Sequence, residues 1–375
     1  MTPIVRVSPW LSLLTPILRL RRGGWLTNIN AILARLRAID SLVDRDLVER
    51  FRHDIGGLWA TDAKLGVAVS GGADSLALLL LAREALPGMV EAATIDHGLR
   101  PESAKEAQHV VEICDRLEIP HVTLKVTVES GNLQANAREA RYAALANWHD
   151  RRSLGALATA HHADDQAETL LMRLNRGSGL SGLAGIRAKS WIRPKETGGE
   201  YRLLRPLLGW RKSELIEVTR RANIGWISDP SNEDDNFDRV RVRKALAEQD
   251  WLDPVALSKS AQLLGEVWSD VEWEASAKLN RSVVRQDDGF VFFGSAGRVF
   301  EIENVLWICE QMGKKVSRSE ADQLLNRMLE EKKTSLAGIQ VRKIMHPTGP
   351  NSSQAGWKFE SEPPRKAGSR PKSNN

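Results

Sequence analysis

The chain has 375 residues, of which 42% are hydrophobic and 27% are charged, and its formal net charge is +5. A chain of this length is expected to form about two or three domains, and its composition excludes a disordered or fibrous protein while remaining compatible with a polyanionic partner. No apolar run approaches the roughly 18 residues of a membrane span, and the two distant cysteines, Cys114 and Cys309, provide neither a disulfide framework nor a Cys-x-x-Cys site, which favours a reducing cytoplasm.

Residues 1–55 are predicted to form an N-terminal extension followed by a helix. Between residues 1 and 40 arginines outnumber acids, which is typical of targeting segments, but Pro16 and Arg19 interrupt the apolar stretch that a secretory signal needs. A poorly ordered extension is therefore the preferred interpretation. From Asn30 to Arg52, leucine and isoleucine recur at helical spacing and predict a helix.

The segment Leu65–Ala85 predicts a buried strand, a glycine turn and a helix. Residues 65–69 are apolar and partly β-branched, the turn SGGADS at residues 70–75 has two glycines, and residues 76–85 have the Leu and Ala content of a helix. A helix that begins at such a turn directs free N–H groups and the positive end of its dipole into the turn, which favours an anion. The alternative is an ordinary capped turn; Asp74 would repel a phosphate unless it caps the helix or meets a metal ion.

Strands and helices alternate beyond this turn. Further strands are predicted at residues 90–95, 121–128 and 156–160, with helices between them. This alternation indicates a mostly parallel sheet with helices on both faces. The loops that begin at Ser70 and Asp96, and the one at His161, should therefore meet at the carboxyl edge of the sheet, where ligands bind in such folds.

The third of these loops carries the acidic sequence HHADDQAET from residue 161. On a helix Asp165 and Glu168 share a face, as do His161 and Asp165. These acids could simply complement the dipole at a helix N-terminus. Because acids beside a phosphate loop are unfavourable without a cation, a functional role is preferred. A metal ion is one candidate cation, but histidine and aspartate also cluster without a metal.

Basic residues gather in the segments that follow. Residues 176–186 are rich in Gly and Ser and predict a flexible loop, and Arg205 follows a turn between two strands within residues 191–201. Residues 238–249 are predicted to form a helix. This helix carries four cations, Arg239, Arg241, Arg243 and Lys244. They either face solvent or bind phosphates.

A domain boundary is expected near Pro254, and residues 251–360 are interpreted as a small binding domain because they lack a catalytic cluster. The tail at residues 361–375 is basic and predicted to be disordered. The elements predicted between them are helices at 257–279, 302–312 and 318–329 and a hairpin within 281–300.

The turn SGGADS resembles the phosphate loop of the PP-loop ATP pyrophosphatases, and with five later segments it resembles the tRNA(Ile)-lysidine synthetase family. Those segments are, in order, DHGLRPES, NAREARYAAL, HHADDQAETLLMRLNRGSGLSGLAGI, RPLL and DPSNEDDNFDRVRVR. The matching segments fall between Ser70 and Arg243, close to half of the chain. The resemblance implies an α/β fold: a Rossmann-like, parallel-sheet PP-loop domain of the adenine nucleotide α hydrolase type at residues 56–250, with a smaller mixed α/β, tRNA-binding C-terminal domain.

The resemblance also implies a reaction and its partners. Enzymes of this family use ATP and Mg²⁺ to adenylate the wobble cytidine of an isoleucine tRNA with a CAU anticodon, which releases pyrophosphate. The side-chain amine of free L-lysine then displaces AMP and leaves lysidine, which pairs with A rather than G. A cytoplasmic enzyme is expected, and the family suggests a homodimer.

The resemblance assigns roles to individual residues as well. Catalytic roles are expected of Asp74, His161, His162, Asp165 and Glu168, with either histidine or the acids as the base that deprotonates lysine. Nucleotide binding is expected of Ser70, Gly71, Gly72, Ala73, Asp74, Ser75, Asp96, His97, Arg176 and Gly177. Asp74 and Asp165 would approach Mg²⁺, and Asp165 and Glu168 would bind the lysine amine. Contacts to substrate RNA are expected of Arg205, Arg239, Arg241 and Arg243; Val240 departs from the Asn of a typical DRNRVR segment.

Two other functions compete with this interpretation. A PP-loop tRNA thiolase would need reactive cysteines or an iron–sulfur site, whereas Cys114 lies on the apolar face of a predicted helix. A non-catalytic tRNA-binding relative would not need the intact Ser70, Asp74 and Ser75. The ligase is therefore the preferred function.

Overall fold

A computed structural model describes residues 42–60, 62–98, 103–128, 131, 133–194, 199–227, 238–294, 297–349 and 352–362. The chain divides into two compact units, the first formed by Met1–Ser178 with Gly185–Gln262 and the second by Gly179–Ala184 with Leu263–Asn375. The predicted N-terminal extension before residue 42, the whole DPSNEDDNF segment (residues 229–237) and the predicted tail after residue 362 lie outside the described residues.

The first unit is built on a six-stranded sheet in the order β3-β2-β1-β4-β6-β5. Every neighbouring pair is parallel except β5 with β6, which confirms the predicted mostly parallel α/β fold. The strands are β1 (Leu65–Ala68), β2 (Val90–Asp96), β3 (His121–Lys125), β4 (Ala156–Ala158), β5 (Lys189–Ile192) and β6 (Tyr201–Leu204).

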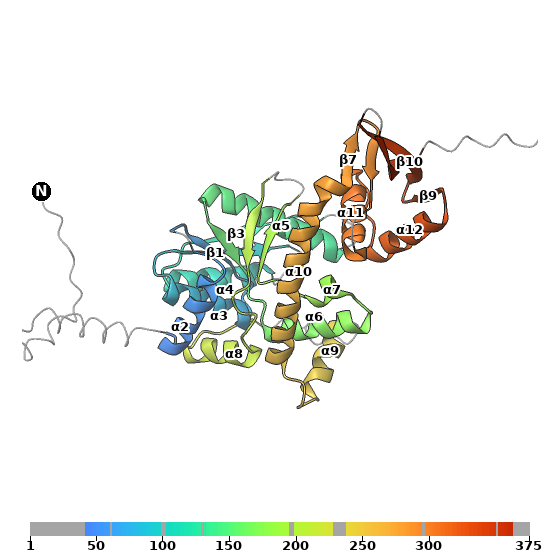
Figure 1. Ribbon diagram of the computed structural model, residues 1–375. Helices are drawn as coiled ribbons and strands as arrows, with labels where there is room; N and C mark the ends of the chain where they lie inside the picture. Colours follow the sequence, from blue (N-terminus) through green and yellow to red (C-terminus); the bar gives the residue numbers. More distant parts are fainter. Residues whose placement is uncertain are drawn as a thin grey trace, which may run out of the picture. The chain divides into compact units, whose positions relative to one another are not determined.

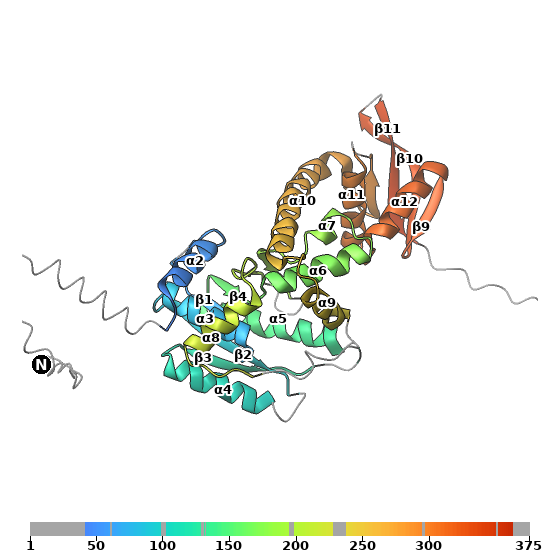
Figure 2. The same cartoon turned by 90° about the horizontal axis from the view of Figure 1, so that it is seen from below.

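Helices cover both faces of this sheet, as Figures 1 and 2 show. Side chains of β1 alternate between the two faces, so Leu65 and Val67 enter one core cluster with α2, α3, α4 and α8, whereas Ala68 packs against the other cluster with α5. The helices of this unit are α2 (Arg45–Gly56), α3 (Ala73–Ala85), α4 (Ser103–Arg116), α5 (Leu133–Arg152), α6 (Ala163–Asn175), α8 (Lys212–Arg221) and α9 (Asp238–Ala247).

Helix α3 is the most deeply buried of these helices. Residues 76–82 are completely enclosed, because α2 and α8 pack beside it and the sheet lies beneath it. A helix that is apolar on every side, as the run of leucines in α3 is, belongs in such an interior position. The phosphate loop that precedes α3 is therefore held by the rigid centre of the unit.

The second unit contains an antiparallel sheet in the order β7-β8-β11-β10-β9, with α11 and α12 sharing its core. Its elements are the later part of α10 (Pro254–Ser282), β7 (Val283–Gln286), β8 (Gly289–Phe292), α11 (Arg298–Gln311), α12 (Arg318–Glu330), β9 (Lys333–Leu336), β10 (Ile339–Gly349) and β11 (Ser352–Ser361). The predicted hairpin turns at Asp287 and Asp288, between β7 and β8.

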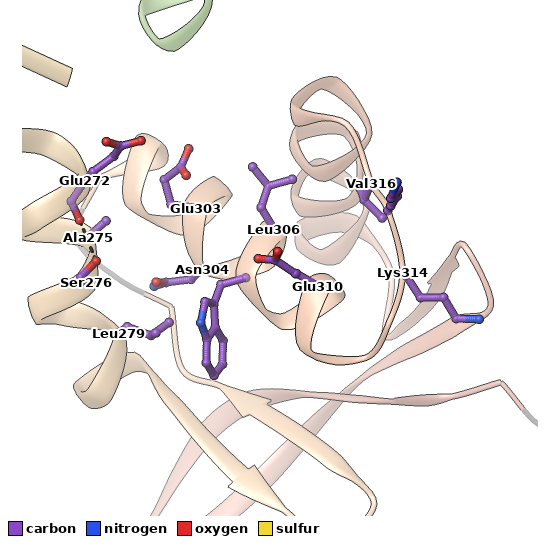
Figure 3. Close-up of a pocket in the computed structure, with 12 residues that line it drawn as sticks. Glu272, Ala275, Ser276, Leu279, Glu303, Asn304, Leu306, Glu310, Lys314 and Val316 are labelled. Atoms are coloured by element: carbon purple, nitrogen blue, oxygen red, sulfur yellow. Dashed lines mark hydrogen bonds between the residues drawn. The ribbon is translucent and has the colours of Figure 1, made fainter. Parts of the chain in front are cut away.

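A pocket of about 510 Å³ lies within this second unit, between α10, α11 and the turn after α11. Figure 3 shows Asn304 and Glu310 of α11 beside Ala275 and Leu279 of α10. Asn304 is buried, and its Nδ2 atom has no hydrogen-bond partner among the described residues. Carboxylates on the pocket wall, such as Glu303 and Glu310, do not resemble a phosphate site.

The structure differs from the predicted organisation at three places. Helix α2 belongs to the first unit, since Phe51 and Ile55 are buried in its core, so this unit begins before the predicted residue 56. The division expected near Pro254 falls between Gln262 and Leu263, inside α10. The predicted flexible loop at 176–186 contains a short helix, α7 (Leu180–Leu183). Within the described residues, no helix is both long and apolar enough to cross a membrane.

The packing around strand β1 leaves no room for a side chain at Gly66. A Cβ atom there would lie 2.5 Å from Leu157, 2.7 Å from Leu154 and 2.8 Å from Trp148, and all three side chains are buried. We therefore expect Gly66→Ala to lower the free energy of unfolding by about 1–3 kcal/mol through overpacking, measured by urea denaturation.

Gly57→Ala is the matched control for this substitution. The backbone of Gly57 is right-handed helical, with φ −68°, and its nearest contacts for a Cβ are at 3.8 Å. Its free energy of unfolding should stay within about 0.5 kcal/mol of the wild-type value. Equal denaturation midpoints for the Gly66 and Gly57 variants would contradict the close packing described for β1.

Candidate active site

The turn between β1 and α3 is closed by its own side chains. Ser75 Oγ accepts a hydrogen bond from Ser70 N–H (3.1 Å), lies 3.2 Å from Ser70 Oγ and donates to the Gly72 carbonyl (2.9 Å). Gly71 has φ +85°, a conformation that favours glycine, and its carbonyl accepts from Ile227 N–H at 2.9 Å. No described side chain caps α3. Its first N–H groups and its dipole therefore remain available to an anion.

His162 connects this turn to α6. It is the N-cap residue of α6 and is 4% exposed. Its Nε2 atom lies 3.6 Å from Asp74 Oδ2 and 3.5 Å from Asp165 Oδ2, while Nδ1 lies 3.5 Å from Asp164 Oδ2. The acid of the phosphate loop and the acids of α6 thus surround one imidazole.

The two adjacent histidines have opposite protonation preferences. Burial alone would lower the pKa of His162, but Asp164 and Asp74 outweigh it and raise the pKa to about 9. Burial lowers the pKa of His161 to about 4; Asp165 opposes this shift, and the positive charges of Arg205, Arg239 and Arg138 reinforce it. At neutral pH His162 is an imidazolium and His161 is a neutral imidazole, with Nδ1 3.1 Å from Thr159 Oγ1.

The charge of His162 also decides how it caps the helix. A contact of 3.4 Å from Asp165 N–H to Nδ1 of His162 requires an unprotonated Nδ1, so it belongs to the neutral form. In the imidazolium, Nδ1–H faces Asp164 instead. The reciprocal bond, from His162 N–H to Asp165 Oδ2 at 3.1 Å, is compatible with both forms.

Asp165 and Glu168 both face arginines of α9. Arg239 donates to Asp165 Oδ1 (2.6 Å) and Glu168 Oε2 (2.5 Å), and Arg243 donates to Glu168 Oε1 (2.6 Å). Glu168 is 1% exposed, so its carboxylate is buried together with the guanidinium groups that pair with it. This differs from the expectation that these arginines extend toward RNA: Arg239 and Arg243 are engaged with the acids of α6. Val240, which departs from the typical segment, is buried.

Arg176, Gly177 and Arg241 lie away from the phosphate loop. Arg176 follows the C-terminal end of α6, about 20 Å of helix from His162 at its start, and Gly177 follows with φ +65°. Arg176 donates to Asp238 Oδ2 at 3.2 Å, and Arg241 also pairs with Asp238. The structure therefore does not place Arg176 and Gly177 with the nucleotide loop, and Arg241 is exposed on the outer side of α9.

Asp96 and His97 end β2, next to the phosphate loop. Asp96 Oδ1 accepts hydrogen bonds from Gly98 N–H (3.0 Å) and Ser103 Oγ (2.8 Å), which lower the pKa of Asp96 and fix the turn after the strand. Burial lowers the pKa of His97, whose Nε2 lies 3.4 Å from Arg141 Nη2. Since β1 and β2 are parallel neighbours, their ends meet at one edge of the sheet.

Asp164 is a residue of this site to which the sequence analysis gave no role. Its Oδ2 accepts from Lys212 N–H at 2.8 Å, and its Oδ1 lies 3.6 Å from Arg211 Nε. Asp164 therefore complements the N-terminus of α8 as well as His162, although burial opposes its charge. Its position inside HHADDQAET was visible in the sequence, but the partner at residue 212 was not.

The residues present fit a Mg²⁺ ion only in part. Within the described part of the chain, no three metal-ligating side chains form a cluster. Both oxygens of Asp165 are engaged, by Arg239 and by His162 N–H. Asp74 Oδ1 is enclosed and lacks a hydrogen-bond partner among those residues, so it is the one free carboxylate oxygen. One carboxylate suffices for a Mg²⁺ ion that takes its other ligands from phosphates and water.

The pKa values of His161 and His162 are shifted in opposite directions, so the two histidines should titrate at different pH. In NMR-monitored titrations, His162 should lose its proton near pH 9 and His161 should gain one only near pH 4. Since the folded-state pKa of His162 lies above the ordinary 6.5, its contribution to stability is complete below about pH 6.5 and is lost as the pH rises through about 9. In Asp164→Asn the His162 titration should move toward neutral pH. Two histidines that both titrate near pH 6.5 would contradict this account.

Comparison with known proteins identifies the family. The chain matches the family model described as a PP-loop domain over residues 43–250, just over half of its length. It is 45% identical over 240 residues to the tRNA(Ile)-lysidine synthase of Zymomonas mobilis subsp. mobilis, a match that covers 62% of this chain and 72% of that protein. It is 49% identical over 225 residues to the tRNA(Ile)-lysidine synthase of Novosphingobium aromaticivorans, covering 60% and 68%.

Among solved structures, the chain is similar to the U34-tRNA thiolase NcsA from Methanococcus maripaludis. The TM-score is 0.48 at 17% identity, and the match covers 59% of this chain and 78% of that chain. This likeness is too distant to bear on the reaction, unlike the sequence matches. The chain therefore belongs to the tRNA(Ile)-lysidine synthase family.

Proposed function

We propose that this protein ligates L-lysine to the 2-position of the wobble cytidine in the CAU anticodon of isoleucine tRNA, through an adenylated base and with release of pyrophosphate and AMP. The observation that carries the proposal is that two carboxylates from different elements lie beside the imidazole of His162. This residue brings Asp74 of the phosphate loop and Asp165 of the acid pair to within 3.6 Å and 3.5 Å of the same imidazole nitrogen. A phosphate site and an amine site are therefore neighbours.

The phosphate loop supplies the first half of the chemistry. N–H groups at the start of α3 and the exposed hydroxyl of Ser70 hold the triphosphate and orient its α-phosphorus toward the 2-carbonyl oxygen of the cytidine, while Ser75 keeps the turn closed through its hydrogen bond to the Gly72 carbonyl. A bound Mg²⁺ ion would supply positive charge to the leaving pyrophosphate, and Asp74 is the residue that would hold it. The His162 imidazolium limits the repulsion between Asp74 and the phosphates.

The acid pair supplies the second half. Asp165 and Glu168 bind the ε-ammonium of lysine, which competes there with the guanidinium groups of Arg239 and Arg243. The free amine has an ordinary pKa near 10.4, so its deprotonation at pH 7 costs about 4–5 kcal/mol. Of the two histidines, only His161 is unprotonated at neutral pH; because burial lowers its pKa to about 4, it is a weak base that would pass the proton on to water rather than hold it.

The remaining proposals concern partners. The tRNA contacts the second unit and the exposed cations of the first unit, such as Arg241. The protein works in the cytoplasm, where tRNA is modified. A homodimer remains the expected assembly. Within this proposal, Val240 packs inward and leaves RNA contacts to its neighbours on α9.

A sulfur-transferring function is disfavoured by both cysteines. Cys114 and Cys309 are buried, and burial raises their pKa to about 12 and about 11. Neither thiol is a reactive thiolate at neutral pH. A non-catalytic role is disfavoured by the hydrogen-bonded phosphate loop with its uncapped helix.

The proposed reaction has a direct assay. Purified protein, ATP, Mg²⁺ and isoleucine tRNA with a CAU anticodon should form AMP and pyrophosphate only when L-lysine is added, and the tRNA should gain the mass of lysine less water. Turnover that requires a sulfur donor instead, or no lysine-dependent AMP at all, would overturn the proposal.

Substitution of either of these two acids beside His162 should abolish product. We expect Asp74→Asn and Asp165→Asn to lower kcat on the order of 10²-fold or more, because each removes a charge that is aligned with the reacting groups. Glu217→Gln is the control, since Glu217 pairs with Arg220 and Arg221 on α8 and should retain wild-type turnover. An Asp74 or Asp165 variant with near-wild-type kcat would remove that residue from the site.

A further inference from the structure

Arg205 is a buried cation for which the described residues provide no counter-ion. It directly follows β6 and is 7% exposed. Its Nη1 atom donates to the Arg187 carbonyl (2.7 Å) and to Ser190 Oγ (2.9 Å), while Nε is enclosed and lacks a hydrogen-bond partner among the described residues. None of the ion pairs between described residues includes Arg205. Buried charges are normally paired, so this arrangement favours an anion that the described residues do not supply, such as one carried by a bound substrate.

The surroundings of Arg205 are basic and neutral. Burial lowers its pKa, and the charge of Arg138 lowers it further, whereas contact with Tyr142 opposes this shift. Arg138 itself lies over the Tyr142 ring, 4.9 Å from the centroid. The hydroxyl of Tyr201 is also buried and without a partner among the described residues. Two guanidinium groups and two phenols thus converge where no described carboxylate forms an ion pair with them.

His161 joins this basic group to the acid pair. Its protonation responds both to Asp165 and to Arg205 and Arg138, so one imidazole lies within electrostatic range of both. Free lysine carries its side-chain ammonium at one end of four methylene groups, and its carboxylate and α-ammonium at the other. With the side-chain ammonium at Asp165 and Glu168, the carboxylate would be the anionic group that a nearby cation could bind.

We propose that Arg205, assisted by Arg138, binds the α-carboxylate of the amino-acid substrate and so distinguishes lysine from other primary amines. This inference rests on the proposed ligase function and adds a specificity residue to it. The guanidinium would donate charge-assisted hydrogen bonds to the carboxylate, which would neutralise a charge that no described carboxylate pairs with.

An RNA phosphate is the competing anion, and burial disfavours it. RNA backbones are gripped by exposed cations such as Arg241, whereas Arg205 is almost completely enclosed. The triphosphate is disfavoured because its proposed site is the turn at Ser70–Ser75, and no hydrogen bond between described residues joins Arg205 to that turn. A small carboxylate that is itself enclosed on binding fits the position best.

The test compares L-lysine with L-lysinamide, which keeps both amines and lacks the carboxylate, in the AMP-forming assay. For wild-type protein we expect the KM of lysinamide to be at least about tenfold higher than that of lysine. Arg205→Gln should raise the KM of lysine by about tenfold or more and leave the KM values of lysinamide, ATP and tRNA within about twofold. Arg205→Lys should recover part of the lost affinity for lysine.

Arg193→Gln is the matched control. Arg193 follows β5, is exposed and pairs only with Glu200 among described residues, so all four KM values should be unchanged. Equal KM increases for lysine and lysinamide in Arg205→Gln would show a merely structural role, and an increase confined to tRNA would show an RNA phosphate; either result overturns the inference.

Two results for the wild-type protein alone are also informative, because they do not depend on whether Arg205→Gln folds. Wild-type protein that uses lysinamide as well as lysine would overturn the inference even if Arg205→Gln does not fold. Wild-type protein that forms no AMP with lysine would instead overturn the ligase function itself. Normal lysine turnover with no discrimination against lysinamide would leave the ligase intact and remove only the role of Arg205.

Discussion

The structure depends on one buried imidazolium surrounded by carboxylates. His162 lies 3.5–3.6 Å from Asp74, Asp164 and Asp165, which belong to the start of α3 and to the first turn of α6. Asp164 extends the contact to the N-terminus of α8 through Lys212 N–H. Three helix N-termini are therefore fixed around a single positive charge. Without it, the acids would repel one another beside a loop that must also accept a triphosphate.

The arginines of α9 complete the charge balance on the other side of the acids. Arg239 bridges Asp165 and Glu168, and Arg243 holds the remaining oxygen of Glu168. In the proposed reaction, a substrate ammonium that enters this place would exchange one cation for another, so the acids would not be left buried and unpaired. Arg205, which also acts on the charge of His161 and has no ion-pair partner among the described residues, would make this arrangement selective for a molecule with charge at both ends.

Much of the first unit could be predicted from the sequence, because its signals are local. The apolar β1 segment, the glycine turn and the leucine-rich α3 each follow from a short window, and alternation fixed the parallel sheet. The charge pairing could not be predicted in this way. Arg239 is separated from Asp165 by 74 positions, and whether an arginine on a basic helix faces RNA or an internal acid depends on packing. The strands β9–β11 were missed because their exposed residues, such as Met345, give no clear alternation.

The most direct measurement is a crystal structure with L-lysine and an ATP analogue whose α,β-bridge is a methylene group. The account predicts the α-phosphorus beside Ser70–Ser75 and the lysine ammonium on Asp165 and Glu168, with Arg239 or Arg243 displaced from these acids. Lysine bound elsewhere, or a triphosphate held away from the start of α3 with the arginine pairs unchanged, would contradict the account.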